Sequence, residues 1–459
     1  MKKLIVLFYL SFLVISSTAF IAHFGEEKPV PVPAGKQRIG DAVKGFEYLT
    51  TGDYVKGGIP YQVFLFGAPK GVNHLQRTGP NAKLSHEYTA VKANNGELLA
   101  APNCMQCHAQ VFDGKLIVGL GNAAIDFTEG QKMNVKNLSL LERFVKARSA
   151  KEYEAAEPFF TVTKTIAPYL HADAPGVNTA DKLAAILVSH RDPETFKWNA
   201  TSSLNIPAEV IPTDTPPWWL LKKKNAMFYN GFGRGDFGRF LMASNLLTVN
   251  DTAEARTVDN HMPDLLAYIY SIEAPKFPHS VDAALAEGGR QIFEKNCSRC
   301  HGTYGTQEKY PNLLIPASII KTDSALYESN YSNPQFVGWF NRSWFTKGDH
   351  PASLQPYKGY IAPPLDGIWI TAPYLHNGSV PTLQALLNSK IRPTYWTRNF
   401  INPEYDYENV GWKFTVDAEP KKGITYNTTT RGYGNYGHYF GDKLNDGERE
   451  AVIEYLKTL

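Results

Sequence analysis

Cysteine is scarce in this sequence: the 459 residues contain four, at positions 104, 107, 297 and 300. The cysteines form two close pairs, and each pair is followed directly by histidine, so the pattern C-x-x-C-H occurs twice. Because the two motifs use every cysteine, none remains for a disulfide, a free thiol or a further thiolate metal site.

The sequence also lacks a charge excess of either sign and, beyond its first residues, a long apolar run. The net charge is +3 and no basic stripe is present, which argues against a nucleic-acid partner. The short run Lys222-Lys223-Lys224 is typical of a solvated patch, or of one that faces the carboxylates of a bound cofactor. No stretch after residue 22 is long and apolar enough to span a bilayer, so membrane contact is expected only through the N-terminus.

The motif C-x-x-C-H is the attachment signal for a c-type haem. Its two thiols form thioether bonds to the porphyrin, and its histidine is the proximal ligand of the iron. A zinc site would need a second ligand pair at finger-like spacing, and a thiol redox pair would need a βαβ context. Neither context is evident, so two covalently bound haem c groups are the preferred interpretation. The residues that would hold them are Cys104, Cys107, His108, Cys297, Cys300 and His301.

Residues 1–22 have the pattern of a signal peptide. Lys2 and Lys3 precede an almost wholly apolar run, and Ser17-Thr18-Ala19 offers a cleavage site. The apolar run is also long enough to be interpreted as an uncleaved N-terminal anchor. Both interpretations place the rest of the chain outside the cytoplasm, as a periplasmic or secreted protein, which is where c-type haem is attached.

Proline-rich and glycine-rich segments suggest how the remaining chain is divided. We predict a linker over residues 23–38, an N-terminal haem c domain over 39–279 and a C-terminal haem c domain over 280–459. The first domain would contain large, loop-rich insertions. In its early part, 40–100, we expect loops and a few short strands, with a β-like run at 61–66.

Apolar residues at helical spacing predict a helix over 263–272, another that leads into Cys297, and a last one over 446–456. Each half therefore has a C-x-x-C-H motif and a late helix. From this pattern we expect a mainly α fold made of two cytochrome c-like haem domains with loop-rich insertions.

The ligand on the second face of each iron decides whether that haem transfers electrons or binds small molecules. For the second haem, His438 is the preferred ligand, because its glycine-rich loop would let the backbone approach a porphyrin closely. His376 is the alternative. An open or weakly ligated iron is favoured for the first haem, because no candidate stands out. The candidates there are Met227, Met242, Met262, His171, His190 and His261.

The stretch from Ala362 to Leu383 reads APPLDGIWITAPYLHNGSVPTL, and it resembles a segment of the bacterial dihaem cytochrome c peroxidase superfamily. The segment Pro216-Pro217-Trp218-Trp219 and the tail from Gly434 to the end are similar to the branch that contains the rubber oxygenases. The resemblance covers both haem regions, from about residue 100 to the end. The chain departs from the peroxidases in having no well-placed Met for the C-terminal haem and no clear distal Glu.

The resemblance implies a division of labour between the haems. In this superfamily the N-terminal haem is reactive and the C-terminal haem is a six-coordinate electron relay. His108 would then hold the reactive iron, and His301 with His438 would hold the relay iron.

The resemblance also implies roles for aromatic residues. A tryptophan between the haems, Trp219 or Trp218, would pass electrons. An aromatic residue, Phe232 or Phe237, would cover the open face of the reactive haem. Whether a Ca²⁺ ion between the haems, as in related peroxidases, is kept is left open.

The expected function is that of an exported haem oxidoreductase that activates peroxide or O₂ at the first haem. Its partners would be peroxide, O₂ or an organic substrate, and a small redox partner protein. One alternative is a dihaem electron carrier without chemistry of its own, which requires two six-coordinate irons. A third interpretation is a maturation enzyme that oxidises another protein at a distance through Trp219.

Overall fold

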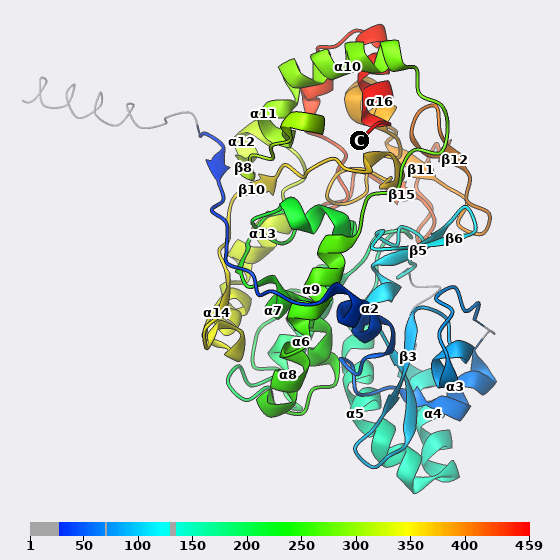
Figure 1. The fold of residues 1–459 in the computed structure, drawn as a ribbon. Coiled ribbons are helices and arrows are strands. Elements are labelled where there is room, and N and C mark those ends of the chain that lie inside the picture. The colour runs from blue at the N-terminus through cyan, green and yellow to red at the C-terminus, as the bar shows by residue number, and fades with distance from the viewer. Residues whose placement is uncertain (1–26, 69–70, 129–134) are drawn as a thin grey trace, which may run out of the picture.

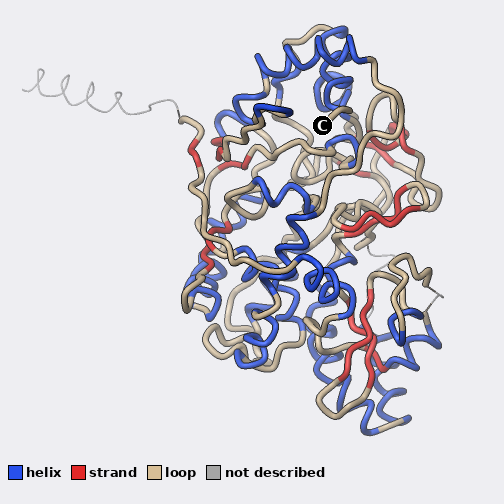
Figure 2. Tube along the Cα trace, viewed as in Figure 1, coloured by secondary structure: helices blue, strands red, loops and turns tan. Residues whose placement is uncertain are grey.

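The computed structural model describes residues 27–68, 71–128 and 135–459. Helices account for 41% of the chain and strands for 13%, and the described strands form small antiparallel sheets (Figure 2). The expectation of a mainly α fold is therefore wrong, and the fold is mixed. Loop-rich segments form short strand pairs, because buried backbone N–H and C=O groups need hydrogen-bond partners. The predicted export segment 1–22 and the first part of the linker lie outside the described residues.

The described chain before residue 280 contains eight α-helices and seven short strands. They are α2 (Ala42–Thr51), α3 (Tyr61–Gly67), α4 (Val135–Arg148), α5 (Ala150–Ile166), α6 (Ala180–Ser189), α7 (Phe237–Leu241), α8 (Thr252–Asp259) and α9 (Met262–Ser271). The strands are β1 (Val30–Pro31), β2 (Ile59–Pro60), β3 (Tyr88–Lys92), β4 (Leu98–Pro102), β5 (Ala109–Phe112), β6 (Lys115–Val118) and β7 (Gly233–Gly235). Residues 61–66 are helical rather than β, because their apolar side chains pack against β4.

The part after residue 280 begins and ends with long helices. Its helices are α10 (Ala283–Asn296), α11 (Ser298–His301), α12 (Ala317–Ile320), α13 (Ala325–Ser332), α14 (Pro334–Arg342), α15 (Leu383–Leu387) and α16 (Asp446–Leu456). Its strands are β8 (Leu313–Pro316), β9 (Ala352–Leu354), β10 (Gly359–Ile361), β11 (Tyr395–Thr397), β12 (Tyr405–Asp406), β13 (Gly411–Trp412), β14 (Thr415–Val416) and β15 (Tyr426–Asn427). The predicted domain boundary near residue 279 falls between α9 and α10.

The same helix pair occurs in both halves of the molecule. Helix α2 packs against α9, and α10 packs against α16, as Figure 1 shows for α10 and α16 at the top. Each contact uses a glycine. A Cβ on Gly45 would lie 1.9 Å from the carbonyl oxygen of Asp264, and one on Gly289 would lie 1.8 Å from that of Ala451. The helices predicted over 263–272 and 446–456, and the one before Cys297, are thereby confirmed.

Each of the two main hydrophobic cores contains side chains from both halves of the chain. The core of the N-terminal half also contains Trp339, Phe340 and Phe345 from α14 and the turn after it. In return, Phe112 of the β5–β6 hairpin and Trp219 are buried in the core of the C-terminal half. The halves are thus packed together by side chains that cross the predicted boundary in both directions.

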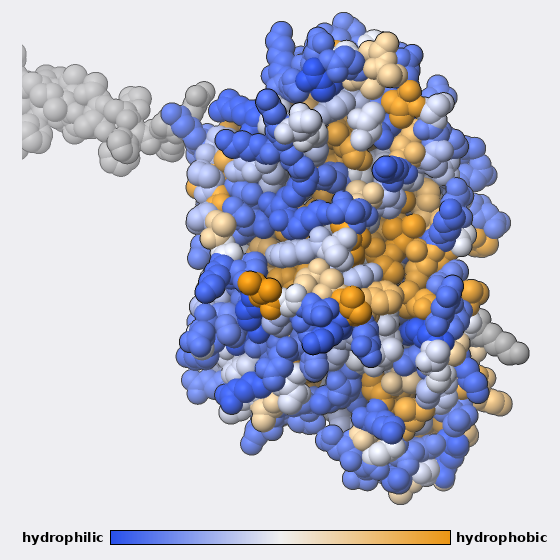
Figure 3. Space-filling model, in the orientation of Figure 1, coloured by the Kyte–Doolittle hydropathy of each residue, from blue (hydrophilic) through white to orange (hydrophobic). Residues whose placement is uncertain are grey.

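An extended segment joins the halves along the surface. Strand β1 pairs antiparallel with β8, with Val30 opposite Leu314. Further along, Arg38 forms ion pairs with Asp236 at 2.8 Å and with Asp259 at 2.7 Å, and both carboxylates are buried. Figure 3 shows a mostly polar face with apolar residues gathered across its middle. Within the described ranges, no helix combines the length and apolar character needed to cross a membrane.

Candidate haem sites

Both C-x-x-C-H motifs line one cavity with a volume of about 790 Å³. Most of the cavity wall is apolar. The motif residues on the wall are Cys107, His108, Cys297, Cys300 and His301. A haem is a large, flat and mainly apolar group, so the wall suits such a ligand.

Each motif forms a single helical turn. The N–H of His108 donates to the carbonyl of Cys104 at 3.0 Å, and the N–H of His301 donates to that of Cys297 at 3.0 Å. Side chains four residues apart on a turn lie on the same side of the backbone. The first thiol and the histidine of each motif are therefore both directed toward one face.

Proline carbonyls lie beside both motif histidines. His301 forms a hydrogen bond through Nδ1 to the carbonyl of Pro363 at 2.8 Å. Nδ1 of His108 makes no hydrogen bond of ordinary geometry among the described residues, although the Pro216 carbonyl is close enough to favour its protonated form. Burial lowers the pKa of His108 to about 4 and also lowers the pKa of His301. Both imidazoles are therefore neutral, which is the form that binds metal.

The cysteines do not have the properties of a redox dithiol. None of the four forms a disulfide. Burial raises the pKa of Cys107 to about 12 and that of Cys297 to about 11, whereas a reactive thiol pair needs a lowered pKa. In the described part of the chain, no group of three or more His, Cys, Asp or Glu side chains is arranged to hold a metal ion. The donor set therefore fits covalent haem c better than zinc, and a Ca²⁺ site stays a prediction.

A second imidazole faces the C-terminal motif. The ring centres of His301 and His438 are 6.1 Å apart, and both residues line the cavity. This separation leaves room for one iron between two imidazole nitrogens at metal–nitrogen distances of about 2 Å. His438 has a left-handed backbone, with φ at 49°, and burial lowers its pKa to about 3. The alternative, His376, is instead stacked on Tyr360 and bonded to its hydroxyl at 3.0 Å.

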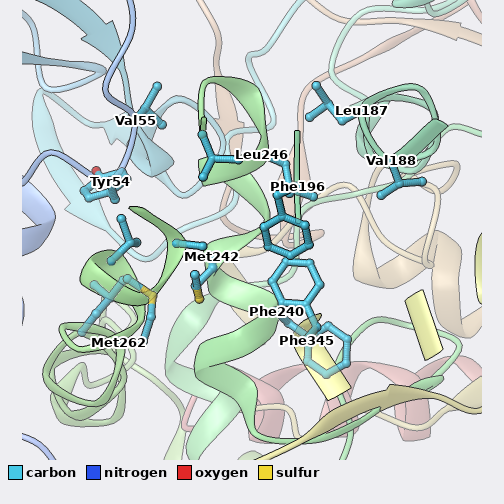
Figure 4. Packing of buried hydrophobic residues seen from close by; sticks show 14 of the residues in the cluster. Tyr54, Val55, Leu187, Val188, Phe196, Phe240, Met242, Leu246, Met262 and Phe345 are labelled. Carbon is cyan, nitrogen blue, oxygen red and sulfur yellow. The ribbon is translucent and has the colours of Figure 1, made fainter. Parts of the chain in front are cut away.

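No second histidine ring contacts His108 among the residues that the structure describes; the ring stacked on it is Trp218, at 4.8 Å between centres. Of the six candidate ligands for the first haem, Met227 lines the cavity. Met242 and Met262 are packed in the hydrophobic core of the N-terminal half (Figure 4). His190 stacks on Trp198, and His261 stacks on Tyr48.

The two adjacent tryptophans point into different halves. Trp218 stacks on His108 and belongs to the core of the N-terminal half. Trp219 is 1% exposed, belongs to the core of the C-terminal half, and donates from Nε1 to the Asp366 carbonyl at 2.8 Å. Phe232 lines the cavity, whereas Phe237 does not. The roles of these residues stay predictions, because the structure shows only their places.

The three lysines at 222–224 have different surroundings. Two of them form ion pairs with carboxylates, and the third lines the cavity. Lys222 pairs with Glu273 and Lys223 with Asp366, both at 2.6 Å. Lys224 lines the cavity and makes no ion pair within the described ranges, and burial lowers its pKa to about 8. Lys224 is half-buried, and its ammonium donates to the carbonyl of Phe228 at 3.5 Å. The carboxylates of a haem would supply a counter-ion for its charge.

A repeated turn with the same sequence spacing follows each proline pair, and it was not predicted from the sequence. Pro216-Pro217 and Pro363-Pro364 are each followed, at the same distance, by Asn-Gly. The backbone matches as well. Phe228 and Leu375 occupy equivalent places with φ at 69° and 67°. This spacing was the signal that could have revealed Tyr229 and His376, the residues before each Asn-Gly, as equivalent cavity residues.

Comparison with known proteins supports a cytochrome-type assignment for part of the chain. Residues 359–397 match a family model described as RoxA-like, cytochrome c-like. This segment contains Pro363, the partner of His301, and the second copy of the repeated turn. A cytochrome c-like segment indicates haem c binding and a cytochrome-type function, and it supports the resemblance to the RoxA-like branch.

Two proteins of Sinorhizobium fredii are similar to longer parts of the chain. Uncharacterized protein y4iJ is 42% identical over 41% of this chain and 41% of its own length. Uncharacterized protein y4iM is 26% identical over 56% of this chain and 67% of its own length. The chain therefore spans less than half the length of the first relative and about two thirds of the second.

Proposed function

We propose that this protein is an exported oxidoreductase with two covalently bound haem c groups, which activates peroxide or O₂ at the His108 haem and relays electrons through the His301 haem. The observation that carries this proposal is the difference between the two motif histidines. His438 faces His301 at 6.1 Å, whereas no second imidazole contacts His108 in the described part of the chain. Export is proposed from the pattern of residues 1–22.

The chain contributes positioning and the exclusion of water. A haem iron with an open face supplies the binding and activation of peroxide or O₂. The apolar side chains of Phe232 and Phe240 line the same cavity as His108 and would exclude water from a bound haem. The Pro363 carbonyl holds His301 through Nδ1 and so directs its Nε2 toward the cavity.

Electrons would pass between the halves through the adjacent tryptophans. Trp218 contacts the ring of His108, and Trp219 is bonded to the loop that follows Pro363-Pro364. Because Trp218 and Trp219 are consecutive residues, an electron that passes between them would cross from one half to the other in a single short step. Peroxide, O₂ or an organic molecule would be the substrate, and a small redox protein would be the electron partner.

Optical and EPR spectra of the purified protein test this proposal. We expect one ferric haem to bind cyanide readily and the other to resist it. After stepwise reduction, peroxide or O₂ should alter the spectrum of the haem that binds cyanide. Two low-spin haems that respond to none of these ligands would contradict an oxidoreductase of this type.

A dihaem electron carrier is the second candidate, and Met227 is the observation that favours it. Its side chain lines the cavity that His108 also lines, so its thioether is available as a ligand. In that case both irons would be six-coordinate, and neither would bind cyanide quickly. A Met227→Leu variant that gained rapid cyanide binding would support the carrier.

A further inference from the structure

The two copies of the repeated turn bind each other at the centre of the molecule. The N–H of Asp214, before the first proline pair, donates to the carbonyl of His376 at 2.8 Å. Reciprocally, the N–H of Ile361, before the second pair, donates to the carbonyl of Tyr229 at 2.8 Å. These four residues all line the cavity, together with both motif histidines. The junction therefore shares one cavity with both motif histidines.

The side chains at this junction form a half-buried tyrosine–carboxylate pair. Tyr229 donates its hydroxyl proton to Oδ2 of Asp214 at 2.9 Å. Asp214 makes no ion pair in the described ranges. Burial has the larger effect on the pKa of Asp214, although the charge of Arg398 lowers it. Burial raises the pKa of Asp214 to about 7, and burial also raises the pKa of Tyr229 well above its usual value. Tyr229 thus keeps its proton unless it is oxidised, and Asp214 can receive that proton.

We propose that Tyr229 is a redox-active tyrosine and that Asp214 is its proton acceptor, as an electron-transfer station separate from Trp218 and Trp219. The proposal rests on the proposed function for its natural oxidant, an oxidised haem centre. One electron leaves the phenol for the oxidised haem, and the O–H bond breaks as the proton moves to Oδ2 of Asp214. The products are a neutral tyrosyl radical, a protonated carboxyl group and a haem centre reduced by one electron.

Three buried tyrosines, Tyr360, Tyr374 and Tyr426, lack such an acceptor. Tyr426 donates its hydroxyl proton to the carbonyl of Asn377 at 2.7 Å, and Tyr374 donates to the carbonyls of Ile368 and Val410. A peptide carbonyl does not accept a proton near neutral pH. Tyr360 bonds to His376 at 3.0 Å, but burial lowers the pKa of His376 to about 3, so this imidazole is a weak base. The carboxylate distinguishes Tyr229 from these three.

Low-temperature EPR of the holoprotein with ring-deuterated tyrosine tests the proposal. Two oxidants are used in parallel: hydrogen peroxide, and photogenerated tris(bipyridine)ruthenium(III), which takes one electron without needing an open iron. The wild type should give a tyrosyl signal that narrows on deuteration. The signal should be lost in Tyr229→Phe and in Asp214→Asn, which keeps the shape of the side chain but cannot take the proton. Tyr426→Phe is the matched control and should keep the signal.

The two oxidants separate this proposal from the proposed function. A Tyr229 signal with ruthenium but not with peroxide would support the tyrosine site while contradicting peroxide activation. A tyrosyl signal that survives Tyr229→Phe, or the absence of any tyrosyl signal with both oxidants, would overturn the proposal. If Tyr229→Phe does not fold with full haem content, an unchanged signal in folded Asp214→Asn would overturn it equally.

Discussion

In the C-terminal half, the motif histidine His301 is held by the Pro363 carbonyl and faced by the imidazole of His438. In the N-terminal half, His108 lies beside the corresponding Pro216, but the ring against it is the indole of Trp218. The two halves thus share a helix pair crossing at a glycine, a C-x-x-C-H turn and a turn after two prolines. They differ in the ring that contacts the motif histidine, which is an imidazole for His301 and an indole for His108. This difference is the basis on which we propose a relay site in the C-terminal half and a reactive site in the N-terminal half.

The largest expected effect comes from removing the thiols of one half at a time. Replacing Cys104 and Cys107 with serine should remove one covalent haem, and replacing Cys297 and Cys300 should remove the other, because each pair forms its own thioethers. Intact-mass spectrometry and the pyridine haemochrome assay of the purified variants measure this. Loss of both haems from either double variant would show that the halves do not load independently.

The second test removes the imidazole that distinguishes the halves. His438→Ala should open the relay iron, so that its ferric spectrum changes from low spin to high spin and it binds cyanide. Met227→Leu should leave the spectra unchanged, because the His108 iron is expected to be open already. A low-spin spectrum retained in His438→Ala would show that another residue binds the iron of His301.

The third test addresses the feature that the halves share. Gly289→Ala and Gly45→Ala should each lower the free energy of unfolding by about 1–3 kcal/mol or more, because the new Cβ would overlap a backbone carbonyl of the partner helix. Denaturant unfolding of the holoprotein measures this. Gly288→Ala is the matched control, since nothing lies within 4 Å of its Cβ, and it should stabilise α10 by about 0.5–1 kcal/mol. Equal effects at Gly288 and Gly289 would contradict the close helix contact.

The smallest expected effect is on the pH dependence of the unfolding free energy. Asp214 and His376, which lie beside the two copies of the turn, should contribute to it with opposite sign. The pKa of Asp214 in the folded state is raised to about 7, so between about pH 4 and 7 the folded protein keeps this carboxyl protonated while the unfolded chain does not. The contribution of Asp214 to the free energy of unfolding therefore falls as the pH rises through this range. Because the pKa of His376 is lowered to about 3, stability from this group is present above about pH 6.5 and is lost as pH falls toward 3.

Unfolding free energies of Asp214→Asn and His376→Gln, measured between pH 4 and 7, should therefore have slopes that deviate from the wild type in opposite directions. The change at each site should be at most a few kcal/mol, since one pKa unit corresponds to about 1.4 kcal/mol. Slopes that change in the same direction would show that the two side chains do not titrate in these environments.

Local patterns predicted the helices that matter most for the two sites. Apolar spacing indicated α9, α10 and α16. In the structure, Asp282 and Asn445 accept hydrogen bonds from the first turns of α10 and α16. The prediction was wrong where tertiary packing overrides local preference. The β-like run at 61–66 is helical, and loop-rich segments pair as strands that local patterns did not place, so the fold is mixed rather than mainly α.

The candidate site could be predicted only where its residues are neighbours in the chain. The motif residues are recognisable because covalent attachment needs two thiols and a histidine at fixed spacing. The pairing of His438 with His301 was predicted from the glycine-rich loop around His438 and from the family resemblance, since the 136 residues between them carry no local signal of contact. Tyr229 and Asp214 were missed because their hydrogen bond depends on the turn between them, and polar residues in a loop are usually solvated.

The sequence by itself determined the chemistry that the two motifs can perform, because bond formation to a haem depends on residue type and short spacing. It also determined the glycines that let the helix pairs approach. Only the tertiary structure decided that both motifs line one cavity, that Trp218 and Trp219 divide between the halves, and that His108 is faced differently from His301. Those features arise from contacts between distant segments, whose formation depends on the packing of the whole chain.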